Sequence, residues 1–223
     1  MVIFMDKKYE IEIIGHIYND YKEKFGVPRQ SGLTKNVISK IIFDKKYSEK
    51  SYFKGIEEFT HIWILWLFSE TIDKDITPTV RPPMLGGNER VGVFATRSPF
   101  RPNHIGLSSV KIERIDFDES LGVVIFVSGA DLINGTPIID IKPYLPYTDS
   151  QPDASNGFAF DDTIGTLEIK YNEYILNKIP FELVDGLLET LRHDPRPSYQ
   201  NDSERIYGMS YSDFQVKFKV NKN

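Results

Sequence analysis

The stretch LSSVKIERIDFDESLGVVIFVS, residues 107–128, decides the fold class. Two runs in it, residues 107–117 and 121–128, are rich in β-branched and aromatic side chains. The polar residues Asp118, Glu119 and Ser120 separate the two runs. Runs of this composition around a short polar segment are typical of two strands joined by a turn. The sequence therefore predicts neighbouring strands over 107–117 and 121–128.

Further short strands are predicted on both sides of this pair, at residues 9–17, 37–43, 91–96 and 137–141. Residues 62–68 form a buried strand or a short helix, and residues 48–59 form two short helical turns broken by Gly55. Many short strands between Pro/Gly loops favour a barrel-like or Greek-key domain. No G-x-G-x-x-G motif follows a strand, which excludes a Rossmann cofactor site. The predicted fold is therefore mainly β, with a single-sheeted β-barrel-like domain over residues 1–150.

The composition changes after the segment SQPDASNG at 150–157. A strand is expected at 163–169, and an amphipathic helix at 180–191. The apolar face of that helix consists of Phe181, Val184, Leu187, Leu188 and Leu191. A hairpin is expected from residues 205–211 and 213–220, whose apolar side chains alternate. Residues 151–223 are thus predicted to form a small α+β C-terminal domain.

Composition and charge narrow the classes of function. The chain has 223 residues, 40% of them hydrophobic, and no cysteine, which excludes disulfides, thiolate metal sites and a cysteine nucleophile. The four histidines lack H-E-x-x-H spacing, so no metal is predicted. The most apolar run, 62–68, is too short to span a bilayer and no signal peptide is evident, so a cytoplasmic protein is expected. The net charge of −5 argues against indiscriminate binding of nucleic acid.

The segment VGVFATRSPFRPNHIGLSS, residues 91–109, is the strongest candidate for a ligand site. It carries Arg97 and Arg101, and Arg81 and Arg90 lie just before it, with Glu89 the one acid between residues 81 and 101. Arginine suits carboxylate or phosphate, and Pro and Gly fix the loop that presents it. The alternative is a solvated loop with surface arginines. These residues favour an anionic or nucleotide-like ligand but do not define a reaction.

Five segments together resemble a known family. They are PRQSGL at 28–33, GIEEFTHIWIL at 55–65, VRPPMLGGNERVGVFATRSPFRPNHIGLS at 80–108, DLINGTPIIDIKPYLPYTDS at 131–150 and HDPRPSY at 193–199. The first four resemble the TsaA-like domain of the TrmO family of tRNA methyltransferases, and the last resembles the tail of its bacterial members. The resemblance implies a homodimeric, S-adenosylmethionine-dependent enzyme. It also implies N6-methylation of N6-threonylcarbamoyladenosine next to the anticodon of threonine tRNA.

The resemblance also implies where ligands lie. Expected contacts of S-adenosyl-L-methionine are Pro28, Arg29, Gln30, Ser69, Glu70, Arg97, Leu107, Ser128, Gly129, Ala130 and Asp131. Arg97 would meet the methionine carboxylate and Asp131 a polar edge of the adenosine, although Asp131 could instead be a turn-forming residue. Expected RNA contacts are Arg81, Arg101, Asp194, Arg196 and Tyr199, with Arg196 on a phosphate and Tyr199 stacking on a base. The alternative for this tail is a helix stop and a surface turn.

No catalytic residue is assigned. The N6–H lies between a purine and an acyl group and is acidic enough for a weak base or water to accept the proton. Three positions depart from the family pattern: Met84 replaces an expected Arg, His104 a Pro and Asn134 an Asp. The alternative function is a non-catalytic regulator that binds S-adenosylmethionine or RNA on the same barrel.

Overall fold

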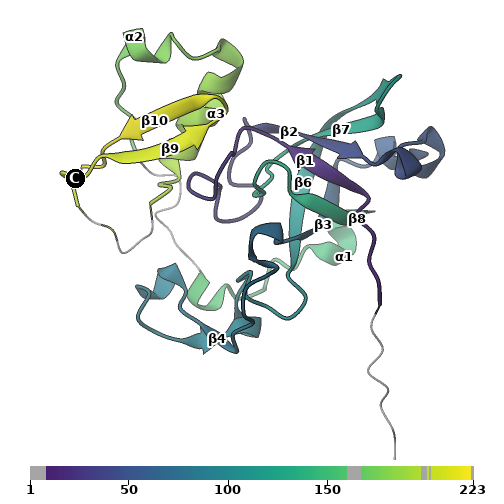
Figure 1. The fold of residues 1–223 in the computed structure, drawn as a ribbon, viewed down its shortest axis with the longest axis horizontal. Coiled ribbons are helices and arrows are strands. Elements are labelled where there is room, and N and C mark those ends of the chain that lie inside the picture. Colours follow the sequence, from purple (N-terminus) through teal and green to yellow (C-terminus); the bar gives the residue numbers. More distant parts are fainter. Residues whose placement is uncertain (1–8, 160–166, 197–199, 201, 222–223) are drawn as a thin grey trace, which may run out of the picture.

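Six antiparallel strands close into a barrel in the computed structural model, which describes residues 9–159, 167–196, 200 and 202–221 (Figure 1). The order around the barrel is β1-β2-β7-β6-β3-β8, and β8 pairs with β1 to close it. The strands are β1 Gly15–Tyr18, β2 Ile38–Phe43, β3 His61–Leu67, β6 Ile105–Asp118, β7 Gly122–Ser128 and β8 Pro137–Pro143. The prediction of a mainly β, barrel-like fold is confirmed.

The predicted pair of strands at 107–128 forms β6 and β7. The carboxylate of Asp118 accepts hydrogen bonds from the backbone N–H groups of Ser120 and Leu121, at 2.8 and 2.9 Å. These bonds close the turn locally, and Gly122 opens β7 with a φ of +78°. Short polar side chains stabilise turns in this way. The pairing of β6 with β7 runs from Asp118 opposite Gly122 to Lys111 opposite Ser128.

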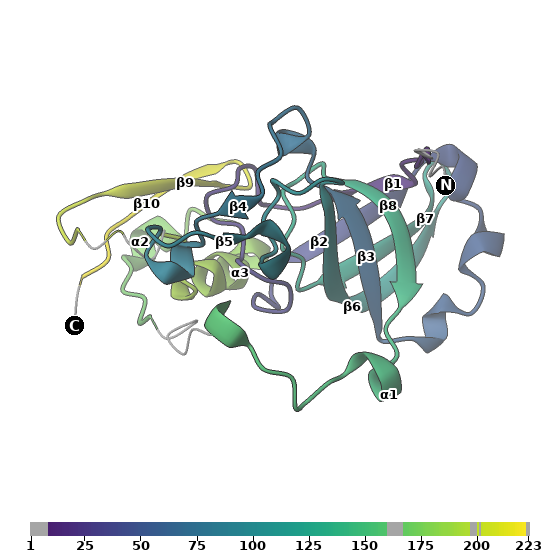
Figure 2. The ribbon, with the colours of Figure 1, turned by 90° about the horizontal axis from the view of Figure 1, so that it is seen from below.

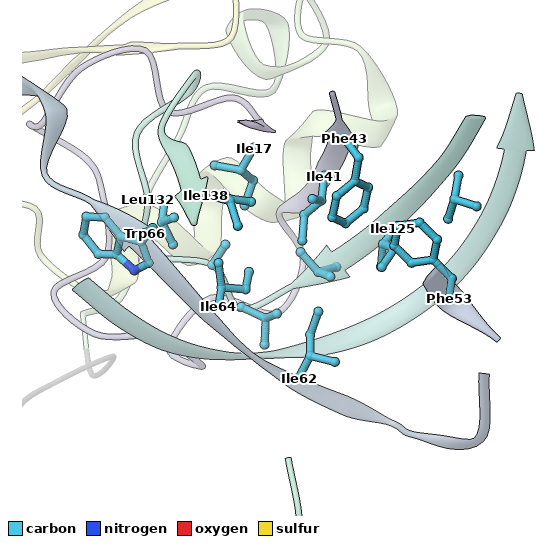
Figure 3. Packing of buried hydrophobic residues seen from close by; sticks show 14 residues of the cluster. Ile17, Ile41, Phe43, Phe53, Ile62, Ile64, Trp66, Ile125, Leu132 and Ile138 are labelled. Carbon is cyan, nitrogen blue, oxygen red and sulfur yellow. The ribbon is translucent and has the colours of Figure 1, made fainter. Parts of the chain in front are cut away.

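Alternation along the strands fills the barrel. In β3 the side chains of Ile62, Ile64 and Trp66 are buried, while the residues between them are partly exposed. They meet Ile17, Ile125 and other apolar side chains from the remaining strands inside the barrel (Figure 3). Every second residue of a strand lies on the same face of the sheet, so one face of each strand contributes its side chains to the core.

Short 3-10 helices η1 Lys45–Tyr47, η2 Lys50–Phe53 and η3 Ile56–Glu58 cover the end of the barrel remote from the C-terminal region (Figure 2). The two predicted helical turns around Gly55 are confirmed as η2 and η3, with Gly55 at a φ of +92°. An arm at the other end holds η4 Ser69–Thr71, β4 Thr79–Val80, η5 Pro83–Leu85, β5 Val91–Gly92 and η6 Val93–Ala95. After β8 come α1 Pro146–Asp149 and η7 Gly157–Ala159.

Two predicted strands are corrected. Residues 91–96 form only the two-residue β5, because the Val93 N–H turns to the Pro78 carbonyl and Thr96 N–H bonds back to Val93 at 3.1 Å, which closes η6. The predicted strand at 9–17 begins only at Gly15. Before it, Ile14 donates one ladder-like bond to Ile138 at 2.8 Å.

The C-terminal region consists of α2 Glu173–Leu176, α3 Phe181–Arg192 and the hairpin β9 Tyr207–Tyr211 with β10 Phe214–Phe218. The predicted helix and hairpin are confirmed. Phe181 does not belong to the buried face, since it is 89% exposed and the packed residues of α3 begin at Leu183. Of the predicted strand at 163–169, residues 163–166 lie outside the described residues, and 167–169 form no strand.

The C-terminal region packs on the excursion that joins β1 to β2, residues 19–37 (Figure 2). Tyr21 and Tyr211 form a β-bridge, and their rings meet edge to face at 6.2 Å. Burial raises the pKa of Tyr21 to about 12, partly offset by hydrogen bonds of its hydroxyl. The Glu189 carboxylate of α3 accepts the backbone N–H groups of Lys35 and Asn36, each at 2.8 Å. The excursion is therefore held between the barrel and the C-terminal region.

Candidate functional site

One end of the barrel gathers most of the predicted site. Strand pairing places the end of β3 beside the start of β6, through Leu67 and Ile105, and the start of β2 beside the end of β7, through Ile38 and Ser128. Ser128 also pairs with Lys111, and Asp131 is bonded to Ser108, so residues 128–131 run alongside residues 108–111 of β6. The tip of the 19–37 excursion returns to the same place.

Two glycines join the excursion to the turn after β7. The Gly32 N–H donates to the Gly129 carbonyl at 2.8 Å. Gly129 has a φ of +84°, and a Cβ built on it would lie 3.2 Å from the Gly32 Cα. A side chain at Gly129 would be strained by its backbone and would press on the facing loop. The close approach joins the segments 28–32 and 128–131, both of which carry residues expected to contact the methyl donor.

A hydrogen-bonded relay leads from the core to Asp131. The Trp66 indole N–H donates to Ser108 Oγ at 3.0 Å, and the Ser108 hydroxyl donates to Asp131 Oδ1 at 2.5 Å. Burial raises the pKa of Asp131, while the bond from Ser108 and the nearby charge of Arg97 oppose that rise. A half-buried carboxylate held in this way is a strong acceptor for a ligand hydroxyl or amine.

The arm reaches the excursion through Arg97, which donates a hydrogen bond from Nη1 to Gln30 Oε1. Both side chains are exposed. A guanidinium has five N–H donors in a planar fork, so a bond to Gln30 leaves a geometry that suits an incoming carboxylate. The structure thus brings Gln30, Arg97 and Asp131 into one group.

The other residues expected at the donor site differ in what they can offer. Ser69 and Glu70 are exposed in η4, after the end of β3. Leu107 is 51% exposed, on the face of β6 that points away from the core. Ser128 is buried and its hydroxyl donates to Glu113 at 2.6 Å, and Ala130 is also buried. Ser128 and Ala130 can therefore serve a ligand mainly through their backbone.

The side chain of Arg29 lies elsewhere. Its Nη2 donates to the backbone carbonyls of Arg196 and Asp194, at 2.8 and 3.4 Å, and Nη1 lies 3.9 Å from the Met84 sulfur. Pro28, beside it, is buried. This link between the excursion and the C-terminal tail is not predicted by the sequence, because 165 residues separate Arg29 from Asp194.

The tail carries the predicted RNA contacts Asp194 and Arg196. Arg196 is only 9% exposed and donates from Nε and Nη2 to the two carboxylate oxygens of Asp194, at 2.8 and 2.7 Å. These bonds raise the pKa of Arg196, and its guanidinium also lies 5.6 Å from the ring of Tyr207. The predicted contact Tyr199 lies outside the described residues. The arginine of the tail is thus directed toward protein groups in this structure.

The two arginines predicted to meet RNA from the arm are both accessible. Arg81 is exposed, and Arg101 is half-buried and donates to the Thr96 carbonyl at 3.1 Å. Among the positions that depart from the family pattern, His104 is buried with a φ of +48°. Asn134 accepts the backbone N–H of Asn19 at 2.9 Å.

In the part of the chain that the structure describes, no three His, Cys, Asp or Glu side chains are grouped closely enough to hold a metal ion. The same residues contain no helix with the length and apolar character needed to cross a membrane.

Comparisons with known proteins agree with this architecture. Residues 16–150 match the family model described as the tRNA-methyltransferase O N-terminal domain, and residues 166–223 match the TrmO C-terminal domain. The chain is 40% identical over 220 residues to the Escherichia coli K12 tRNA (adenine(37)-N6)-methyltransferase, covering 95% of this chain and 93% of that protein. It is 35% identical to a putative S-adenosylmethionine-dependent methyltransferase of Pseudomonas aeruginosa, over 93% and 91% of the two chains.

A crystal structure of TrmO from Pseudomonas aeruginosa superposes with a TM-score of 0.76 at 30% identity, covering 97% of this chain and 95% of that one. The barrel, the appended helix and hairpin, and these relatives define a methyltransferase of the non-Rossmann, β-barrel class. More narrowly, the chain belongs to the tRNA-methyltransferase O family.

Proposed function

We propose that the protein transfers a methyl group from S-adenosyl-L-methionine to N6 of N6-threonylcarbamoyladenosine, at position 37 of threonine tRNA. Two observations together carry the proposal. The chain matches the models of both family domains, in order, and it is 40% identical to a relative named tRNA (adenine(37)-N6)-methyltransferase. The gathering of the predicted donor residues at one barrel end supports it. The threonylcarbamoyl group and the choice of threonine tRNA rest on the motif resemblance.

The residues at the barrel end fit the methyl donor. The joined backbones at Gly32 and Gly129 supply peptide groups, Asp131 supplies a carboxylate, and Arg97 supplies a guanidinium. S-adenosyl-L-methionine supplies an activated sulfonium methyl group when bound. The residues that would hold it are Pro28, Gln30, Ser69, Glu70, Arg97, Leu107, Ser128, Gly129, Ala130 and Asp131, with Arg29 contributing its backbone.

The protein residues act by positioning. Arg97 binds the methionine carboxylate, and Asp131 accepts a hydrogen bond from the adenosine part. Methyl transfer in line requires the nucleophile within about 3–3.5 Å of the methyl carbon, so most of the rate gain comes from orientation. The N6–H is acidified by its acyl substituent, so water or a weak base suffices to take the proton. No side chain is assigned as the proton acceptor.

The RNA side of the site is formed by the arm and the tail. We assign residues 1–150 to donor binding and residues 151–223 to support of tRNA binding. The predicted contacts are Arg81, Arg101, Asp194, Arg196 and Tyr199. Arg81 and Arg101 of the arm meet phosphates, and Arg196, paired with Asp194, holds the tail in the shape that supports tRNA binding. Stacking and base edges supply the choice of nucleotide. The proposal includes a homodimer that acts in the cytoplasm.

Nucleoside analysis tests the reaction. The protein is incubated with S-adenosylmethionine and bulk tRNA from cells that lack this methyl group, and the digested nucleosides are examined by mass spectrometry. We expect the mass of one methyl group to be added to N6-threonylcarbamoyladenosine. Addition to another nucleoside would refute the proposed substrate, and donor binding without any methylated nucleoside would favour the non-catalytic regulator.

A further inference from the structure

We propose that the side chain of Arg29 positions the RNA-binding tail and does not bind the methyl donor. Arg29 therefore has two separate tasks, since its backbone belongs to the donor loop and its guanidinium belongs to the tail. This inference rests on the proposed function, because it takes the tail as an RNA-binding element.

The guanidinium of Arg29 points toward the tail. Nη2 of Arg29 donates to the carbonyl of Arg196 at 2.8 Å and to that of Asp194 at 3.4 Å. Both acceptors are backbone atoms, so the bonds fix the course of the tail rather than one side-chain rotamer. A bond from a charged donor is stronger than one between neutral groups. The half-buried guanidinium is thus committed to the tail.

The second step is the shape of the tail. Asp194 has a φ of +46°, a backbone region that non-glycine residues rarely adopt. Its carboxylate accepts the backbone N–H of Arg196 at 3.2 Å and both of the Arg196 side-chain bonds described above. The segment 194–196 is therefore a tight, internally bonded turn whose carbonyls face Arg29. Loss of Arg29 would leave those carbonyls without their charged donor and release the turn.

The third step is the contrast with the neighbours of Arg29. Gln30 accepts from Arg97, and Gly32 donates to Gly129, so the next residues of the loop face the barrel end. Residues 29–32 form bends and turns, and these contacts direct neighbouring residues to different partners. The donor-facing and tail-facing contacts of this loop therefore belong to different residues, and they can be separated by substitution.

The test compares Arg29→Ala and Arg29→Lys with Lys54→Ala, which removes one exposed positive charge at the C-terminal end of η2. Calorimetry measures the Kd for S-adenosylhomocysteine, and filter binding measures the Kd for threonine tRNA at several salt concentrations. For Arg29→Ala we expect the tRNA Kd and the KM for tRNA to rise by about tenfold or more, with the Kd for the donor analogue changed by less than about threefold.

Two readouts separate positioning from a direct phosphate contact. The salt dependence of tRNA binding keeps its slope in Arg29→Ala if Arg29 acts through the tail, whereas a lost phosphate contact reduces the slope by about one. Arg29→Lys, which keeps the charge but not the planar fork, restores only part of the tRNA affinity. Lys54→Ala behaves as wild type.

The inference is overturned if Arg29→Ala raises the Kd for the donor analogue by about tenfold while tRNA binding is unchanged, or if it changes neither affinity. It is also overturned if the salt slope of tRNA binding falls by about one. Equal losses of both affinities that Arg29→Lys does not relieve would also overturn it, since they indicate a collapsed loop. The binding assays need no turnover. A wild-type protein that binds tRNA without methylating it would therefore refute the proposed function while Arg29 is still tested.

Discussion

Ser108 donates its hydroxyl hydrogen to Asp131 at 2.5 Å, and the bond ties the first turn after β7 to the interior of the barrel. The hydroxyl oxygen in turn accepts from Trp66, so the orientation of the carboxylate that we propose meets the donor depends on a core indole. A carboxylate held this firmly near the core loses solvation, which is why burial raises the pKa of Asp131. The charged form of Asp131, which we propose binds the donor, therefore lowers the stability of the folded protein.

This conflict predicts a pH-dependent gain of stability in Asp131→Asn. A carboxyl whose pKa is higher in the folded than in the unfolded protein lowers the free energy of unfolding as the pH rises from its ordinary value through the raised value. Asparagine does not titrate and still accepts from Ser108. We expect the free energy of unfolding of the variant to increase relative to wild type as the pH is raised from about 4 to 7.

Urea unfolding at several pH values measures that difference, and the Kd for S-adenosylmethionine is measured on the same samples. The variant should bind the donor more weakly, by about tenfold or more, because a charged acceptor is lost. Asp153→Asn, the same substitution at an exposed residue outside the proposed site, serves as the control. A stability difference that does not change with pH would contradict the assigned role of burial.

Arg97→Ala should weaken donor binding. A charge-assisted contact contributes about 1.5–3 kcal/mol, so the Kd for S-adenosylmethionine should rise by more than about tenfold. Arg114→Ala removes an arginine from the outer face of β6, where it pairs with Asp116 at 3.0 Å, and should leave the Kd unchanged. Calorimetry checks both. Unchanged donor binding in Arg97→Ala would remove this residue from the site.

Arg196→Ala should weaken tRNA binding without affecting the donor. Because the guanidinium is buried against Asp194 and Tyr207, we expect the loss to come from release of the tail. The tRNA Kd should then rise while its dependence on salt keeps the same slope. Filter binding at four salt concentrations measures both quantities. A slope reduced by about one would instead place Arg196 on a phosphate, as the motif alone predicts.

Gly186→Ala should destabilise the contact between α3 and the 19–37 excursion. A Cβ at Gly186 would lie 2.5 Å from the Tyr211 hydroxyl and 2.9 Å from Val37 Cγ2. Overpacking costs about 1–3 kcal/mol, which outweighs the gain of about 1 kcal/mol in helix propensity. Thermal unfolding should show a lower Tm, whereas the exposed neighbour Asp185→Ala should show no such loss. A stabilised Gly186→Ala would contradict the packing.

Local patterns were sufficient for most of the barrel. The turn at Asp118 and the apolar alternation in β10 are encoded within a few residues, and each predicts its strands, whereas the wholly apolar run at 62–68 leaves strand and helix open. The strand predicted over residues 91–96 is wrong beyond Gly92. Val91 and Val93 have strand propensity, but the Val93 N–H bonds to the Pro78 carbonyl, a contact that a local pattern does not reveal. Tertiary contacts commonly override propensity in such short runs.

In the candidate site, too, sequence patterns predict some residues and leave others unpredicted. The motif resemblance names Gln30, Arg97 and Asp131, and the structure brings them together. The roles of Ser108 and Trp66 were not predicted, since each is an ordinary strand residue until the barrel closes. The tail contact of Arg29 depends on how the C-terminal region docks, and residues so far apart in the chain carry no local signal of it.

The most direct test of the central claim is methyl transfer from labelled S-adenosylmethionine to purified threonine tRNA, prepared with and without the threonylcarbamoyl group. The account predicts label in the modified tRNA and none in the unmodified tRNA. Label in neither RNA, with the donor still bound by the protein, would contradict the claim that this barrel is an active methyltransferase for threonylcarbamoyladenosine.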